Sequence, residues 1–237
     1  MRREGNVVTT DDIRQRLAAV QKRIAAAATR AGRRPAEVTL VAVSKTMPLA
    51  AVQLAYAAGA TNLGENRVQE AAAKFATFRP PDLTLHLIGH LQRNKAAKAA
   101  HLFDVVQSLD SIALAEALAR HCSERPIPLP VLIQVNVAGE ESKEGVSPAE
   151  TPALVERVLA LPQLGLQGLM TIAPLVADAA EARPVFRRLR ELRDECETRF
   201  HIRLPHLSMG MSNDFEVAVE EGATLVRIGR AIFGERQ

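Results

Sequence analysis

Short apolar runs alternate regularly along this chain with longer segments of helical periodicity. Eight runs have the length and the aliphatic or β-branched composition of buried strands. They lie within residues 38–48, 61–64, 83–88, 103–107, 131–137, 166–170, 206–207 and 225–228. Eight alternating strand and helix units in 237 residues are what a closed parallel barrel requires, whereas an open doubly wound sheet usually has fewer strands. We therefore predict an α/β fold, a single (β/α)8 TIM-type barrel.

Helices are expected before the first strand and between the strands. An extra N-terminal helix is capped near Thr10 and ends before Gly32. The other helical segments are residues 48–59, 68–78, 94–100, 112–121, 148–159, 183–200 and 215–221. The length fits one barrel-sized domain as well as two small domains. The eight alternating units favour the single barrel, so we expect residues 1–237 to form one domain.

The composition argues against nucleic acid and membranes as binding partners. The 30 basic residues are interleaved with 27 acidic ones, and the chain has no Trp and one Tyr, so no basic patch or stacking platform for nucleic acid is expected. Residues 1–10 are polar and charged, and no window reaches the length of a membrane span. Cys122 and Cys196 lack metal-ligand spacing and are expected to be reduced thiols. These features predict a cytoplasmic protein that binds neither nucleic acid nor a membrane.

Lys45 lies at the carboxyl end of the first predicted strand. A lysine there can simply extend its amine to solvent where the strand leaves the core. Alternatively, apolar neighbours disfavour its charged form, and the neutral amine attacks a carbonyl to form a Schiff base. The strand alone leaves both interpretations open.

Polar residues also follow the other predicted strands. In a barrel the carboxyl ends of all strands meet at one face, where barrel enzymes carry their chemistry. The residues at the eight ends are Lys45, Glu65 and Asn66, His90, Ser108 and Asp110, Asn136, Met170 and Thr171, Ser208, and Arg227. Loops are polar in most proteins, so this convergence indicates a site without naming its ligand.

Two glycine turns follow the last two predicted strands. Residues 208–215 combine small residues with Ser212, Asn213 and Asp214 at the start of a helix, where free backbone N–H groups and the helix dipole favour an anion. Residues 227–230 supply a second turn around Gly229, and the loops after strands seven and eight are a frequent phosphate site in barrels. Either turn alone is also compatible with a plain helix cap. Together, and opposite an amine on strand one, they indicate an aldehyde that carries a phosphate.

The motifs that carry a family resemblance are spread over nearly the whole chain. They are Val43-Ser-Lys45-Thr, Gly64-Glu-Asn66, Leu87-Ile-Gly-His-Leu-Gln92-Arg-Asn-Lys95, Gly168-Leu-Met170, Ser208-Met-Gly-Met-Ser212-Asn-Asp and Arg227-Ile-Gly-Arg230. In these motifs the chain resembles the pyridoxal phosphate homeostasis proteins, the YggS or PROSC family. The resemblance implies a fold-type III barrel, similar to the amino-terminal domain of alanine racemase, that binds pyridoxal 5′-phosphate (PLP).

The same resemblance implies a role for each motif residue. Lys45 is expected to form the Schiff base with PLP, Asn66 to lie near the ring, and Arg227 to face the pyridine nitrogen. The residues expected around the phosphate are Ser208, Gly210, Met211, Ser212, Gly229 and Arg230.

An arginine beside the pyridine nitrogen argues against amino-acid turnover. A cationic guanidinium disfavours protonation of that nitrogen, so the ring is a weaker electron sink and transamination is not expected. Racemisation needs an acid–base group on each face of the substrate carbon, and Lys45 serves only one. The alanine racemases use a tyrosine of a partner subunit, whereas Tyr56, the only tyrosine here, lies in the helix after strand one.

We therefore predict a carrier in intracellular PLP homeostasis that binds and buffers PLP and delivers it to apo-enzymes, without robust amino-acid turnover. The alternative is a PLP-dependent amino-acid racemase in which His90 or Ser108 supplies the second acid. Because no counterpart of the second racemase domain is predicted, we expect a monomer.

Three other features are interpreted as structural. His86 and His90 are four residues apart on a strand and have no third ligand nearby in the sequence, so no metal site is expected. The arginines of residues 183–203 alternate with acids, which predicts a solvated helix with internal ion pairs. Residues 140–145 resemble a loop of the family, and both a mobile lid and an exposed charged turn are compatible with them.

Overall fold

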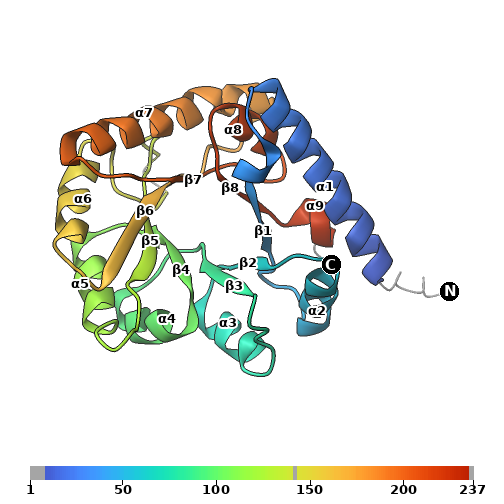
Figure 1. Ribbon diagram of the computed structural model, residues 1–237, viewed down its shortest axis with the longest axis horizontal. Helices are drawn as coiled ribbons and strands as arrows, with labels where there is room; N and C mark the ends of the chain where they lie inside the picture. The colour runs from blue at the N-terminus through green and yellow to red at the C-terminus, as the bar shows by residue number, and fades with distance from the viewer. Residues whose placement is uncertain (1–8, 141–142, 235–237) are drawn as a thin grey trace.

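The computed structural model describes residues 9–140 and 143–234. Eight parallel strands in this part of the chain close into a barrel in sequence order, with β1 paired to both β2 and β8 (Figure 1). The strands are β1 Thr39–Val43, β2 Asn62–Glu65, β3 Thr84–Leu87, β4 Val105–Leu109, β5 Leu129–Gln134, β6 Leu164–Met170, β7 His206–Ser208 and β8 Leu225–Ile228. The predicted (β/α)8 barrel is confirmed.

Helices surround the barrel on its outer side (Figure 1). They are α1 Thr10–Arg30, α2 Leu49–Ala57, α3 Val68–Phe75, α4 Ala96–Leu102, α5 Ile112–Arg120, α6 Thr151–Leu159, α7 Arg183–Phe200, α8 Phe215–Glu220 and α9 Arg230–Phe233. Short 3-10 turns lie at Pro35–Glu37, Arg93–Lys95 and Ala179–Ala182. No helix among the described residues combines the length and apolar character needed to cross a membrane.

The extra helix α1 begins at a capping box, in which the Thr9 side chain and the Asp12 carboxylate each accept from the other residue's backbone N–H. One face of α1 is apolar and packs against α8, α9 and α2. Its buried residues are Ile13, Leu17, Val20, Ile24, Ala27 and Ala28. This helix therefore covers the side of the barrel where the first and last strands meet.

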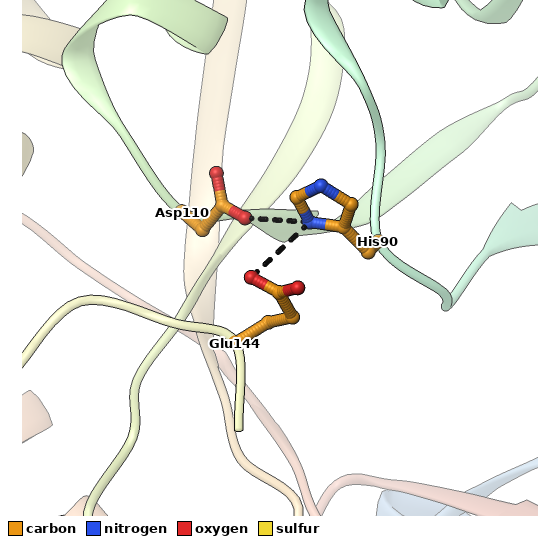
Figure 2. Close-up of side chains that lie close together, drawn as sticks. All are labelled: His90, Asp110 and Glu144. Atoms are coloured by element: carbon orange, nitrogen blue, oxygen red, sulfur yellow. Dashed lines mark hydrogen bonds and ion pairs between the residues drawn. The ribbon is translucent and has the colours of Figure 1, made fainter. Parts of the chain in front are cut away.

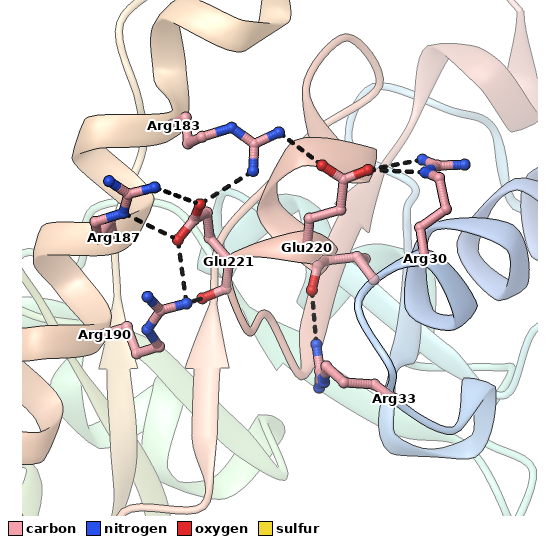
Figure 3. Close-up of polar contacts among 8 residues, drawn as sticks. Arg30, Arg33, Arg183, Arg187, Arg190, Glu220 and Glu221 are labelled. Atoms are coloured by element: carbon pink, nitrogen blue, oxygen red, sulfur yellow. Dashed lines mark hydrogen bonds and ion pairs between the residues drawn. The ribbon is translucent and has the colours of Figure 1, made fainter.

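An ion-pair cluster joins α7 and α1 to the end of α8 (Figure 3). Arg183 pairs with Glu220 at 2.6 Å and with Glu221 at 3.0 Å. Arg190 contacts Glu221 at 3.1 Å, and Arg30 contacts Glu220 at 2.9 Å. The two glutamates thus tie α8 to the helices on both sides.

The prediction of ion pairs internal to residues 183–203 is right only in part. Arg188 pairs with Glu195 at 2.6 Å, and Arg193 pairs with Asp194 at 2.5 Å, within α7. Other arginines of α7 instead reach the two glutamates of α8, because the helices are neighbours around the barrel and sequence spacing shows only contacts within one helix.

Candidate functional site

A cavity of about 860 Å³ opens at the carboxyl ends of the strands. Of the residues named by the resemblance, those that line it are Lys45, Asn66, Met211, Ser212, Arg227, Gly229 and Arg230. Ser208 and Gly210 lie behind this wall: Ser208 is fully buried, and Gly210 packs against α8. The expected site residues therefore gather at one mouth of the barrel, seven in the wall and two in its support.

Lys45 reaches the cavity because successive side chains along β1 point alternately into and out of the barrel. Val41 belongs to an apolar cluster with Leu132 of β5 and Met170 of β6, which places its side chain inside the barrel. Val43 and then Lys45 follow at the same spacing of two residues, and both line the cavity. The next residue, Thr46, has φ 65°, a left-handed conformation that a β-branched residue rarely adopts and that is concentrated at functional sites.

A buried network holds the turn that carries Lys45. The amine of Lys74 donates to Glu65 Oε1 at 2.6 Å and to the backbone oxygen of Ser44 at 2.8 Å, and Ser44 Oγ donates to the same carboxylate oxygen at 2.6 Å. Glu70 Oε1 accepts from the Thr46 N–H at 2.5 Å and from Lys74 at 3.3 Å. Burial raises the pKa of Glu65, and its bonds to Lys74 and Ser44 oppose this. Both neighbours of Lys45 are therefore anchored to β2 and α3.

The turn after β7 offers backbone donors. Asp214 Oδ1 accepts from the Met211 N–H at 2.6 Å, which closes the turn. The N–H groups of Ser212 and Asn213 have no hydrogen-bond partner among the described residues. Arg230, in the turn after β8, donates to Asn213 Oδ1 at 3.2 Å and so links the two turns. Unsatisfied N–H groups beside a cation favour a bound anion.

Two glycines allow these turns to approach their neighbours closely. Gly210 has φ +93°, and a Cβ there would lie 2.6 Å from Ala218 Cβ and 2.8 Å from Phe215 Cα. A Cβ on Gly229 would lie 3.2 Å from the backbone oxygen of Val43. Glycine is therefore required at the first position by both its conformation and its space.

Arg227 projects from β8 into the cavity wall and is 4% exposed. It donates to Ser208 Oγ at 2.6 Å and to the backbone oxygen of Thr171 at 2.8 Å. Burial lowers its pKa to about 10, and the Asp214 carboxylate opposes this. The guanidinium is thus a fixed cation at neutral pH.

The loop after β5 brings a second lysine to the cavity. Lys143 lines the wall, and its amine donates to Glu140 Oε1 at 2.7 Å. Asn136 Nδ2 donates to the backbone oxygens of Glu140 at 2.8 Å and Lys143 at 3.3 Å. Residues 141–142 of the expected lid lie outside the described part of the chain. Asn136 thus bonds to the residue on each side of that segment. From the sequence, Asn136 could be placed at the end of a strand but could be assigned no role.

His90, Asp110 and Glu144 meet at the rim of the cavity (Figure 2). His90 Nδ1 lies 3.0 Å from Asp110 Oδ2 and 3.5 Å from Glu144 Oε2. Burial raises the pKa of Asp110, and the charge of His90 opposes this. The atoms lie close enough together to ligate an ion, and the hydrogen bond between the His90 ring and Asp110 accounts for the shortest of these contacts without one. His86, which the sequence placed near His90, lies instead inside the barrel.

Comparison with known proteins identifies the family. Residues 15–237 match the family described as "Alanine racemase, N-terminal domain". The "Pyridoxal phosphate homeostasis protein" of Aquifex aeolicus is 46% identical over 223 residues, 94% of this chain and 98% of that protein. The protein of the same name in Pseudomonas aeruginosa is 47% identical over 224 residues, 94% of this chain and 96% of that protein. The chain belongs to the pyridoxal phosphate homeostasis protein family.

Solved structures agree with this membership. PipY of Synechococcus elongatus PCC7942, solved with PLP bound, superposes with a TM-score of 0.83 at 43% identity and covers 94% of this chain and 100% of its own. D-threonine aldolase from Filomicrobium marinum has a TM-score of 0.75 at 16% identity, covers 95% of this chain and 61% of its own, and shares the fold alone. The family resemblance stated from the sequence motifs is therefore confirmed over nearly the whole chain.

Proposed function

We propose that this chain binds PLP at the mouth of its barrel and acts in PLP homeostasis by binding, buffering and delivering the cofactor. The observation that carries the proposal is that one cavity is lined both by Lys45 and by the two glycine turns after β7 and β8. A phosphorylated aldehyde needs an amine and an anion site within one pocket. The relatives named for PLP homeostasis and the PLP-bound PipY structure support this choice of aldehyde.

The side chains present fit PLP in distinct roles. Lys45 would hold the aldehyde through a Schiff base, with Asn66 beside the ring. The N–H groups of Ser212 and Asn213, with Arg230, would hold the phosphate, and Ser208, Gly210, Met211 and Gly229 would shape or support that end. Bound PLP supplies an electron sink. Arg227 would face the ring nitrogen and, as a cation, would keep protons away from it.

A carrier is favoured over a racemase by the groups in the cavity wall. Tyr56, the only tyrosine in the sequence, is on α2, where its hydroxyl bonds to Asp82 and its ring packs edge-on against Phe78. It therefore does not supply the acid that racemisation requires opposite Lys45. Of the two acids considered for the racemase alternative, Ser108 is fully buried and does not line the cavity, and His90 is held by Asp110 at the rim.

Three finer properties belong to the same proposal. We propose that apo-enzymes accept the cofactor, that the chain is a monomer, and that it works in the cytoplasm. The buried free thiols of Cys122 and Cys196 support a reducing compartment.

A transfer assay tests the proposal. We expect PLP-loaded protein to restore the activity of a PLP-requiring apo-enzyme, and Lys45→Ala protein, after the same loading and desalting, to restore little. With L-alanine as substrate, we expect no D-alanine. Formation of D-alanine by the wild type that disappears in Lys45→Ala would establish the racemase instead.

A further inference from the structure

A chain of hydrogen bonds crosses the barrel interior and ends at Arg227. Asn62 Oδ1 lies 3.1 Å from His86 Nε2, and His86 Nδ1 lies 2.9 Å from Gln107 Nε2. Gln107 Oε1 accepts from Ser208 Oγ at 2.6 Å, and Ser208 Oγ accepts from Arg227 at 2.6 Å. Gln107 is on β4 and Ser208 on β7, which are not neighbours in the barrel, so their contact passes through the interior.

With the Gln107 and Asn62 amides oriented as in the structure, the donors in this chain run in one direction. Arginine has no acceptor, so Ser208 Oγ accepts from Arg227 and passes its own hydrogen to Gln107 Oε1. The other end of the Gln107 amide then donates to His86 Nδ1, which leaves the hydrogen of the ring on Nε2, facing Asn62 Oδ1. Burial lowers the pKa of His86 to about 3, so the neutral ring that this order requires is the form present at neutral pH.

Polar side chains inside a barrel carry a cost that this arrangement offsets. Barrel interiors are usually filled by branched aliphatic residues, and each unpaired buried polar group is destabilising. His86 is 3% exposed, and Gln107 and Ser208 are fully buried. Each of these three side chains nevertheless has two hydrogen-bond partners in the chain. A satisfied buried network fixes orientation, and here the oriented end is the guanidinium in the cavity wall.

We propose that His86 and Gln107, although neither lines the cavity, are positioning residues that act through Ser208 to hold Arg227 against the ring nitrogen of the bound cofactor. Ser208 Oγ and the Thr171 backbone oxygen are the two fixed points of the guanidinium. Loss of the Gln107 acceptor frees the Ser208 hydroxyl to rotate and so loosens one of these points. This inference rests on the proposed function, because it concerns how PLP is held there.

The test compares two substitutions on neighbouring residues of β4. Gln107→Met keeps the volume and removes the two hydrogen bonds that Gln107 makes in the chain, whereas Val106→Ala removes buried apolar volume and leaves the chain intact. Each protein is loaded with PLP labelled with 15N in the ring, and the 15N chemical shift and the PLP dissociation constant are measured. We expect Gln107→Met to move the ring signal toward its protonated value and to weaken binding about three- to tenfold, as loss of roughly one hydrogen bond does.

The controls separate positioning from stability. We expect Val106→Ala to lower thermal stability without moving the ring signal, and Gln107→Met with Ser208→Ala to shift that signal no further than Ser208→Ala alone. A wild-type signal and affinity in Gln107→Met would overturn this inference and leave the proposed function standing, whereas a wild type that binds no PLP would overturn both. Equal changes of the 15N ring signal in Val106→Ala and Gln107→Met would also overturn the inference that Gln107 positions Arg227. If Gln107→Met does not fold, Gln107→Asn, which withdraws the amide by one methylene, allows the same comparison.

Discussion

His86 shows how a single buried base makes the stability of this barrel depend on pH. Its ring is 3% exposed and is surrounded by the amides of Asn62 and Gln107. Burial and, to a smaller extent, the charge of His206 lower its pKa from 6.5 to about 3. Between about pH 3 and pH 6.5 the unfolded chain therefore binds a proton at His86 that the folded chain does not bind. Stability from this residue is present above pH 6.5 and is lost as the pH falls toward 3.

We expect His86→Gln to make the free energy of unfolding less sensitive to acid. Glutamine can accept from one amide and donate to the other, but it does not titrate in this range. Between pH 7 and pH 5 the wild type should lose about 2 kcal/mol more than the variant, from the shift of pKa and linkage. Urea unfolding at both pH values measures the difference. Equal losses in the two proteins would show that folding does not lower the pKa of His86.

Single residues differ in how far the sequence could predict them. Lys45 and Arg227 could be named because each ends a strand of clear pattern and matches a motif. Gln107 and Lys74 could not, because their roles depend on partners from other elements: Ser208 lies across the barrel, and Glu65 lies on β2. The pairing of Glu70 with Lys74 at helical spacing was the only local signal for the network beneath Lys45.

At the scale of elements, the turn after β7 is held to α8 by a contact that only glycine permits. Gly210 has φ +93°, and its Cα faces Ala218 and Phe215 of α8. The same turn carries Met211 and Ser212 into the cavity wall. The position of the proposed phosphate donors is therefore coupled to the packing of α8.

We expect Gly210→Ala to destabilise the protein by about 3 kcal/mol, combining left-handed strain with overpacking, and to weaken PLP binding. Gly139→Ala is the matched control, because Gly139 also has positive φ, at +69°, but has open space around it. It should cost about 1 kcal/mol, from conformation alone. Urea unfolding and PLP titration of both variants provide the measurements. Equal losses of stability and of PLP affinity in the two variants would mean that the contact of Gly210 with α8 contributes to neither.

The sequence predicted the order of the elements better than their ends. The strand expected at residues 131–137 is β5 Leu129–Gln134, and the helix expected at 94–100 is a 3-10 turn followed by α4 Ala96–Leu102. Helix α9, Arg230–Phe233, was missed because four residues are too few to show helical periodicity. The gathering of site residues was predictable because the carboxyl ends of parallel strands share one face of a barrel.

At the scale of the whole molecule, closure of the barrel is what turns separate motifs into one site. Lys45 and Arg227 are 182 positions apart in the sequence, but β1 pairs directly with β8, and Val41 is opposite Arg227 in the register. Helix α1 packs over this closing seam against α8 and α9 (Figure 1). The amine and the glycine turns therefore face one cavity only in the folded barrel.

We propose that Lys45, and no other lysine, holds the aldehyde of PLP. Lys143 lines the same cavity and is the natural competitor. The most direct test is borohydride reduction of the PLP-loaded protein, followed by mass mapping of the modified peptide in the wild type, Lys45→Ala and Lys143→Ala. We expect label on Lys45 in the wild type and in Lys143→Ala, and none in Lys45→Ala. Label on Lys143 in the wild type, or undiminished labelling in Lys45→Ala, would contradict it.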